Sequence, residues 1–386
     1  MDRVAVTRPS SVQDIFILRP DNLGDVVLFS GALRAVRGHF PNAKITLCTR
    51  RYTHNLLELC PHIDRLVAWE SVSGFLINRF PLLKGMRGVG PLYAWLCQYA
   101  NRQFQPDLLL LPVRSPNPEM HVIAQTISAK AKYSICGDNT NQALTSKKMV
   151  DQGYTDCLRL TPESYQTHEL DITKDFLNFL GLSVCKEDIW PEFWTAESDR
   201  QWAAQHMAGP GDAVSVAICP GATTGGDKKF YPSAHYAEAF NQLRNGRFAV
   251  TLFGSSAERD ICQSVADALS NCARVVHIQN LAGATTIRQL VESFRFCDLV
   301  ISQETGALHM AVGLRKPTIG IMGGGHYGRF YPWGNPAINR VVDHKMNCYW
   351  CHWQCKYSTM RCIQEIEPGD IAAAIHTVLN VKLKSS

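Results

Sequence analysis

One stretch decides the fold of this chain: Cys297-Asp-Leu-Val-Ile-Ser-Gln-Glu-Thr-Gly-Ala-Leu-His-Met-Ala-Val-Gly-Leu-Arg-Lys-Pro-Thr-Ile-Gly-Ile-Met-Gly-Gly324. Residues 299–301 form a short apolar run of the kind found in buried strands. Residues 302–306 are polar and predict a turn, and residues 307–314 have helical spacing. A second apolar run follows at 318–322. The stretch therefore predicts a strand–turn–helix–strand unit of a parallel α/β sheet.

The turn of this unit faces the N-terminus of its helix. Free backbone N–H groups and the positive end of the helix dipole gather there, so the turn suits a phosphate or a sugar hydroxyl. Glu304 offers an acceptor, Thr305 offers a donor, and Gly306 allows close approach. The same residues also suit an ordinary crossover with a polar loop, and taken alone they leave both interpretations open.

Strand and helix patterns alternate along most of the chain, which predicts parallel sheets covered by helices. A first helix is expected from Val26 to about His39, and a late one spans about 368–383. Chain length predicts two domains, residues 1–190 and 191–386, with Ile189-Trp-Pro near the connection. Strands are predicted at 15–18, 44–48, 66–67, 108–111, 132–135, 214–219, 248–253 and 275–278.

Composition narrows the class of protein. A net charge of +5 over 386 residues, with no dense basic block, argues against a nucleic-acid partner. The N-terminus lacks the apolar core of a signal peptide, and the longest apolar stretch, 108–113, is too short to span a membrane. We therefore expect a cytoplasmic protein whose 14 cysteines are mostly reduced. Cysteines in apolar contexts, such as Cys48, Cys219 and Cys297, should be buried as small hydrophobic residues.

The segment 71–105 interrupts the alternation with apolar residues edged by Lys84, Arg87 and Arg102. Such a segment could contact the inner membrane face or a lipid-linked acceptor. A helical pair packed on its own domain explains the same pattern and is the more frequent case.

Ser302-Gln-Glu-Thr-Gly-Ala-Leu-His309 resembles the Asp-Thr-Gly-x-x-His signature of glycosyltransferase family 9, the heptosyltransferase-like family. This sequence departs from the signature by Glu304 in place of Asp, which would shift a sugar contact. The resemblance implies the GT-B fold, an α/β architecture of two Rossmann-like doubly wound domains facing a central cleft. In that fold the last helix, about 368–383, would return toward the N-terminal domain. His309 would brace the signature loop.

Gly24-Asp25-Val-Val-Leu-Phe-Ser-Gly-Ala-Leu33 is similar to the N-terminal signature of the same family. The resemblance gives Asp25 the role of general base, with Gly24 as its structural support. A carboxylate at the end of a first parallel strand lies where α/β sheets bind ligands. The alternative is that Asp25 is only the N-cap of the following helix.

The resemblance continues in Cys219-Pro-Gly-Ala-Thr-Thr-Gly-Gly-Asp-Lys-Lys-Phe-Tyr-Pro232. There Thr223 and Thr224 would donate to a diphosphate, and Lys229 would supply the positive charge. Spacing to Pro232 favours Lys229 over Lys228, and a generic surface turn is the alternative. Glu258 resembles the family carboxylate that holds the nucleotide ribose, although the first turn of a helix favours Glu in any protein.

Together these matches imply an inverting glycosyltransferase that uses a nucleotide-sugar donor and needs no cofactor for catalysis. ADP-heptose is the implied donor. The implied acceptor is a glycan or glycolipid, a lipopolysaccharide core or another cell-envelope glycan, with peripheral membrane contact. Alternatives are a protein (autotransporter-type) heptosyltransferase, and a GT-B nucleotide-sugar-binding protein or epimerase without transferase activity.

Four cysteines lie close together near the C-terminus: Cys348, Cys351, Cys355 and Cys362. They resemble a cysteine-rich segment found in many members of the family. Four thiolates complete a tetrahedral shell, so the cluster is a candidate structural zinc or iron site. The spacing lacks the paired C-x2-C knuckles of a strong zinc motif, and simple packing under the last helix is the alternative.

Overall fold

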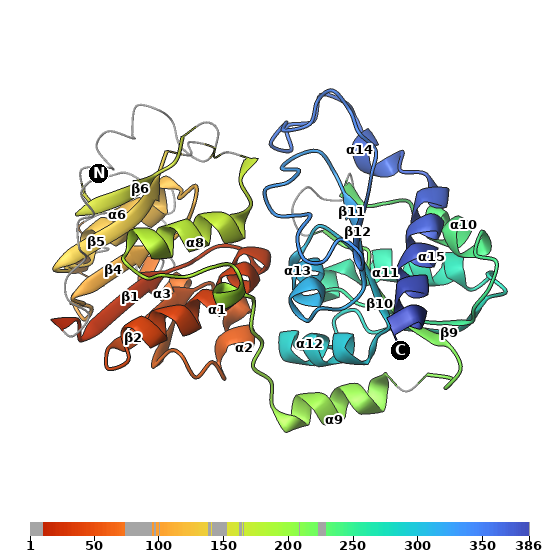
Figure 1. Cartoon of the computed structure of the whole chain (residues 1–386), viewed down its shortest axis with the longest axis horizontal. Coiled ribbons are helices and arrows are strands. Elements are labelled where there is room, and N and C mark those ends of the chain that lie inside the picture. The colour runs from red at the N-terminus through yellow and green to blue at the C-terminus, as the bar shows by residue number, and fades with distance from the viewer. Residues whose placement is uncertain are drawn as a thin grey trace. The chain divides into compact units, whose positions relative to one another are not determined.

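The computed structural model describes residues 11–73, 95, 98–99, 101–137, 140, 153–161, 164, 166–207, 209–222 and 229–385 (Figure 1). The chain divides into two compact units, Met1–Pro191 and Glu192–Ser386. This division falls one residue from the boundary expected from sequence. Each unit is built on a six-stranded sheet whose strands all run parallel.

The first unit has the strand order β3-β2-β1-β4-β5-β6. These strands are β1 (Asp14–Leu18), β2 (Lys44–Thr49), β3 (Arg65–Ala68), β4 (Leu108–Leu111), β5 (Ala131–Cys136) and β6 (Asp156–Arg159). Phe16 and Leu18 pack in one core cluster with Ile123, whereas the alternating residues Ile15 and Ile17 are buried on the opposite face. Both faces of the sheet are therefore covered, as expected for a doubly wound unit.

The helices of the first unit follow the strands in sequence. They are α1 (Leu23–His39), α2 (His54–Leu57), α3 (Trp69–Ser73), α6 (Pro118–Thr126) and α8 (Glu169–Phe179), with short 3-10 turns η2 (Arg51–Thr53) and η5 (Glu187–Ile189). Helix α1 contacts α8 and η5. At that contact Gly31 lies directly against the backbone carbonyl of Trp190, where a β-carbon would collide. Helix α8 ends at Phe179, and Gly181, just after the C-cap residue Leu180, has the positive φ of 91° that is common at helix ends.

The second unit has the strand order β12-β11-β10-β7-β8-β9. Its strands are β7 (Val214–Cys219), β8 (Phe248–Leu252), β9 (Val275–Asn280), β10 (Leu299–Gln303), β11 (Thr318–Met322) and β12 (Asn339–Asp343). In both units the first strand of the unit pairs with the fourth. That neighbouring pair is the switch point at which strand order reverses, where open α/β sheets bind ligands.

Seven helices and a short turn accompany this sheet in the described residues: α9 (Glu197–His206), α10 (Ser233–Asn241), η7 (Ser256–Glu258), α11 (Arg259–Leu269), α12 (Ile287–Phe296), α13 (Gly306–Gly313), α14 (Arg361–Gln364) and α15 (Pro368–Ser385). Helix α15 lies beside α10 and also contacts β11 and β12 (Figure 1). Its apolar residues Ile371, Ile375 and Val378 belong to the core of the second unit. Its return toward the N-terminal domain and the cleft between domains stay predictions.

Most predicted helices and strands are present. The differences lie in strands at the sheet edges and at the ends of helices and strands. Strands β4, β7 and β11 have the predicted bounds, whereas β6 and β12 were not predicted. Helix α1 begins at Leu23, three residues earlier than the expected start at Val26, and its N-cap residue is Asn22. The interpretation of Asp25 as the N-cap is therefore wrong, since Asp25 lies in the first turn.

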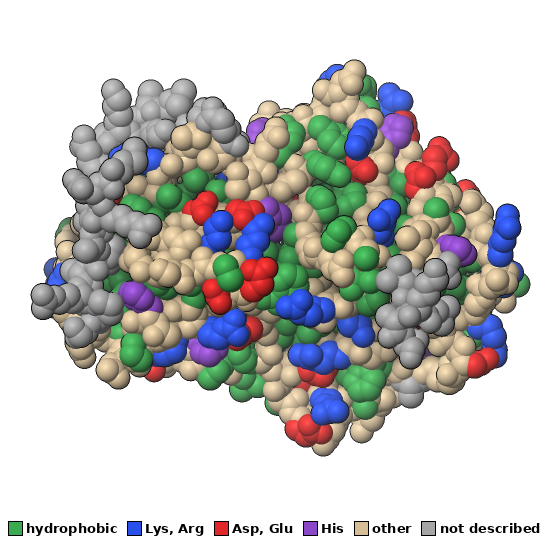
Figure 2. All heavy atoms as spheres, in the orientation of Figure 1, with side chains coloured by type: hydrophobic (Ala, Val, Ile, Leu, Met, Phe, Trp, Pro, Cys, Tyr) green, Lys and Arg blue, Asp and Glu red, His purple; other side chains and the backbone are tan. Residues whose placement is uncertain are grey.

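The apolar segment 71–105 lies largely outside the described residues, so its two interpretations stay open. Of its described side chains, Trp95 stacks on Tyr99 with ring centroids 6.1 Å apart, and both are exposed. Within the described chain, no helix combines the length and apolarity needed to cross a membrane. Lys and Arg side chains are interspersed with acidic ones on the face shown in Figure 2.

Candidate active site

The switch point of the second unit brings two of the predicted site segments together. Strands β7 and β10 pair in parallel, with Cys219 opposite Ser302. Residues 220–222 leave β7 and residues 304–306 leave β10 at the same edge of the sheet. The buried side chain of Gln303 donates a hydrogen bond from Nε2 to the Pro220 carbonyl oxygen, 2.9 Å away. One side chain thus ties the two loops to each other.

Ser302 and Gln303 are strand residues and not part of the predicted polar turn. Strand β10 continues through Gln303, and both side chains are buried. The Ser302 hydroxyl donates to the Gln303 carbonyl oxygen at 2.7 Å. The prediction was wrong here because these polar side chains satisfy their hydrogen bonds inside the sheet edge, where sequence alone suggested solvent.

Glu304, Thr305 and Gly306 are half-buried at the start of α13. Thr305 is the N-cap residue, with extended φ and ψ of −144° and 177°. Its hydroxyl lies 3.4 Å from the Ser302 hydroxyl and makes no capping hydrogen bond in the described chain. The Thr305 hydroxyl therefore leaves the first N–H groups of this helix to other acceptors.

His309 lies one helical turn after Gly306 and is buried. The indole N–H of Trp333 donates to its Nδ1 at 3.1 Å, and the two rings stack with centroids 6.2 Å apart. The imidazole is therefore held by packing and a hydrogen bond. Bracing of the signature loop by His309 stays a prediction, and sequence reasoning had not singled out Trp333.

Lys229 is buried, with 7% of its surface exposed. Its amine lies 3.4 Å from the centroid of the Trp353 ring. Burial lowers the pKa of Lys229, while the negative charge of Glu304 acts in the opposite direction. Lys229 and the loop after β10 are thus close enough to interact electrostatically. Thr223, Thr224 and Lys228 lie outside the described residues.

Glu258 projects from η7 toward the loop after β7. Its Oε2 accepts hydrogen bonds from the Ser255 backbone N–H at 2.7 Å and from the Ser255 hydroxyl at 2.8 Å. Its other oxygen lies against Gly221, where a β-carbon would collide with the carboxylate. The side chain therefore has both a local role at the start of α11 and a position at the ligand edge of the sheet.

In the first unit, Gly24 and Asp25 lie in the first turn of α1, half-buried, directly after the switch-point strand β1. The buried guanidinium of Arg19 forms an ion pair with Asp21 at 3.0 Å and donates to the Pro112 carbonyl after β4. It also reaches the Asp25 carbonyl oxygen at 3.5 Å. Arg19 ties the loops after β1 and β4 as Gln303 ties those of the second unit, and sequence reasoning missed both.

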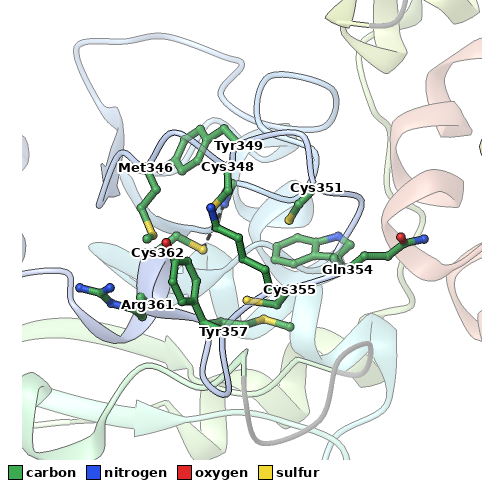
Figure 3. Close-up of a pocket in the computed structure, with 13 residues that line it drawn as sticks. Met346, Cys348, Tyr349, Cys351, Gln354, Cys355, Tyr357, Arg361 and Cys362 are labelled. Carbon is green, nitrogen blue, oxygen red and sulfur yellow. Dashed lines mark hydrogen bonds between the residues drawn. The ribbon is translucent and has the colours of Figure 1, made fainter.

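The four C-terminal cysteines line one cavity of about 80 Å³ (Figure 3). Cys362 is buried and Cys348, Cys351 and Cys355 are half-buried. Burial raises the pKa of the Cys362 thiol. No set of three His, Cys, Asp or Glu side chains in the described chain lies at metal-binding spacing. Every cysteine of the described chain has a free thiol, and Cys48, Cys219 and Cys297 are buried as expected.

Comparisons with known proteins identify the family of this chain. The profile of "Glycosyltransferase family 9 (heptosyltransferase)" matches residues 164–359, just over half of the chain. Lipopolysaccharide heptosyltransferase 2 of Salmonella typhimurium is 29% identical over 316 residues, covering 80% of this chain and 82% of its own length.

Two solved structures share the fold. The Escherichia coli ADP-heptose lipopolysaccharide heptosyltransferase II superposes with a TM-score of 0.68 at 18% identity, over 96% of this chain and 99% of that one. The iron-containing dodecameric glycosyltransferase TibC of enterotoxigenic Escherichia coli has a TM-score of 0.53 at 12% identity, over 96% and 77%.

Two parallel six-stranded α/β units of this kind define a GT-B-like fold. The chain belongs to glycosyltransferase family 9, the heptosyltransferase family. Within that family it is similar to the enzymes that build lipopolysaccharide and lipooligosaccharide cores.

Proposed function

We propose that this protein transfers a heptose from ADP-heptose to a lipopolysaccharide core or a related cell-envelope glycan. The observation that carries the proposal is the second-unit switch point, where Lys229, Glu258 and the 304–306 turn lie at one sheet edge. A buried ammonium, a carboxylate and a helix N-terminus are the groups that recognise phosphate and hydroxyl groups of a nucleotide-sugar. The sugar and the acceptor are inferred from two relatives, the Salmonella lipopolysaccharide heptosyltransferase 2 and the Escherichia coli ADP-heptose lipopolysaccharide heptosyltransferase II.

The proposed reaction is a single displacement with inversion. The acceptor hydroxyl oxygen attacks the anomeric carbon while the bond from that carbon to the phosphate oxygen breaks, and ADP leaves. Asp25 takes the proton of the acceptor hydroxyl. Lys229, together with Thr223 and Thr224, stabilises the negative charge that develops on the diphosphate. Glu304, Thr305 and Gly306 would contact the sugar or the phosphates, and no metal is needed for these steps.

A coupled assay tests this proposal. ADP release and acceptor mass are followed with ADP-heptose and a lipopolysaccharide core that lacks its heptoses. We expect ADP release only when both substrates are present, with one added heptose per acceptor. Release without acceptor would indicate a nucleotide-sugar-binding protein or epimerase. Transfer to a protein substrate in preference to the glycan would support the autotransporter-type alternative.

This reaction places the enzyme where ADP-heptose and a membrane-borne acceptor meet. We propose a cytoplasmic location with peripheral contact at the inner membrane face. Fractionation of cells tests it: the enzyme should leave membranes at high salt, because contacts between exposed charges are screened.

Gly221→Ala should weaken nucleotide binding without changing the fold. The new methyl group would displace the Glu258 carboxylate, which we propose holds the ribose. Loss of a charged hydrogen bond corresponds to roughly 10-fold weaker binding or more. Calorimetry with ADP measures the effect. Gly211→Ala is the matched control, because its β-carbon would meet nothing within 4 Å. Equal affinity in the two variants would remove Glu258 from the site.

We also propose a structural zinc or iron ion at Cys348, Cys351, Cys355 and Cys362. The donor set fits a thiophilic metal, and the shared cavity supports the assignment. The thiols as they lie are not spaced for coordination, so they would have to close on the ion and lose their protons. A fold relative that contains iron, TibC, makes iron the first element to seek.

Elemental analysis of protein purified without chelator should find about one metal ion per chain. Chelation should then lower the melting temperature, because a structural metal binds the folded state in preference to the unfolded one. Cys355→Ser should lower the metal content, whereas Cys185→Ser, outside the cluster and exposed, should not. A metal-free protein with an unchanged melting temperature would mean that the four cysteines bind no structural metal and only pack in the core.

A further inference from the structure

We propose that Trp353, on the cysteine-rich segment, is a positioning residue that holds the Lys229 ammonium for the donor diphosphate. The inference rests on the proposed function and deepens it, because it adds a residue to those that the family resemblance assigns to the donor site. Its basis is the 3.4 Å separation between the Lys229 amine and the centroid of the Trp353 ring.

The ring holds the lysine without neutralising it. A carboxylate at this place would cancel the charge that a diphosphate needs, whereas an aromatic face attracts the cation and carries no net charge. The negative charge of Glu304 acts on the Lys229 amine and opposes the lowering of its pKa by burial. The ring therefore leaves the three N–H donors of the ammonium to a phosphate on the side away from the ring.

Burial makes this contact strong. Lys229 is 7% exposed, and water competes little with the ring for a cation in such a place. A flexible four-carbon side chain otherwise loses much conformational freedom when it is fixed. An ammonium that is already held in place has lost that freedom before the donor binds, so donor binding carries a smaller entropy cost.

The backbone around Trp353 is built to place the ring. Three glycines follow β11, and β-carbons at Gly324 and Gly325 would collide with the rings of Tyr349 and Trp353. A β-carbon at Gly323 would also lie 3.0 Å from a Trp353 ring atom. Trp353 itself has a φ of 62°, in the left-handed region that non-glycine residues adopt at a cost. Its side chain also lines the cavity of the four cysteines.

The test compares ring-retaining and ring-deleting variants. Trp353→Leu should weaken ADP binding on the order of tenfold, whereas Trp353→Phe, which keeps an aromatic face, should stay near wild type. Trp350→Leu makes the same change on the same segment and serves as the control. Calorimetry with ADP gives the affinities, and initial rates give the KM for ADP-heptose.

A double-mutant cycle with Lys229→Met separates positioning from general damage. If the ring acts through the ammonium, Trp353→Leu should change ADP affinity by less than about twofold once Lys229 is Met. Gly325→Ala, which would push the ring aside, should reproduce the Trp353→Leu affinity. An unchanged affinity in Trp353→Leu, an equal loss in Trp350→Leu, or an equal loss in the Lys229→Met background would overturn the inference.

Failure of the proposed function gives a different result. A wild-type protein that binds no adenine nucleotide would overturn the proposed donor, and with it the inference. A wild-type protein that binds ADP, together with a Trp353→Leu variant of the same affinity, would overturn the inference alone.

Discussion

Replacement of Asp25 by Asn should lower turnover by about two to four orders of magnitude while ADP affinity stays at the wild-type value. The amide has nearly the shape of the carboxylate but cannot take the proton of the acceptor hydroxyl. Asp25 lies in the first turn of α1, after the switch-point strand of the first unit. Initial rates with saturating ADP-heptose and acceptor measure the loss.

Helix α15 offers a closely matched control. Its first three residues are Pro368, Gly369 and Asp370, so Asp370 occupies the place in α15 that Asp25 occupies in α1. Either Asp→Asn change removes a carboxylate from a helix N-terminus and should cost about 0.3–1 kcal/mol of stability. Only Asp25→Asn should lose turnover. Rates for Asp25→Asn within tenfold of wild type would leave Asp25 without the role of base.

Lys229→Met should weaken ADP binding by roughly 10- to 150-fold, the value of a charge-assisted hydrogen bond to phosphate. Methionine has a similar length and can pack on the Trp353 ring. Lys228→Met, the neighbouring change, should weaken binding much less. Calorimetry on both variants decides between the two lysines, and an unchanged dissociation constant for Lys229→Met would overturn the assignment.

The same variant should be as stable as wild type or more so near neutral pH. Burial lowers the pKa of Lys229 below its value in the unfolded chain, so the folded state disfavours the charged lysine. That penalty is fully present below the folded-state pKa, shrinks as the pH rises above it, and is gone above the unfolded-state pKa. The gain in melting temperature of Lys229→Met should therefore shrink toward alkaline pH. A lower melting temperature at neutral pH would mean that Lys229 stabilises the fold.

Central strands were predictable because they carry mostly apolar runs. Strands β4, β7 and β11 are buried along most of their length, and their predicted bounds coincide with the structure. Strands β6 and β12 lie at the sheet edges and are half-exposed, with sequences Asp-Cys-Leu-Arg and Asn-Arg-Val-Val-Asp. Edge strands need no continuous apolar run, so their sequences resemble loops.

Parts of the candidate site could be predicted because they follow strands directly. Glu304, Glu258 and Asp25 lie where the loop after a strand turns into a helix, and sequence places such residues well. The contact of Lys229 with Trp353 could not be predicted, because it joins residues far apart through an irregular segment with positive φ angles. The hydrogen bond of Gln303 to Pro220 was missed because a polar residue at a strand end suggested a turn.

The strand order of both sheets has a consequence for how the enzyme is made. The first strand of each unit pairs with a strand much later in the chain. Ile15 in β1 pairs with Leu108 in β4, and Val216 in β7 pairs with Leu299 in β10. Long loop closures are slow and entropically costly steps in folding. During synthesis on the ribosome, the switch point of each unit cannot form until the fourth strand of that unit has emerged. Until then, the first strand has one edge without a hydrogen-bonded neighbour. Because each switch point forms only when the first and fourth strands pair, we expect the protein to depend on chaperones during synthesis.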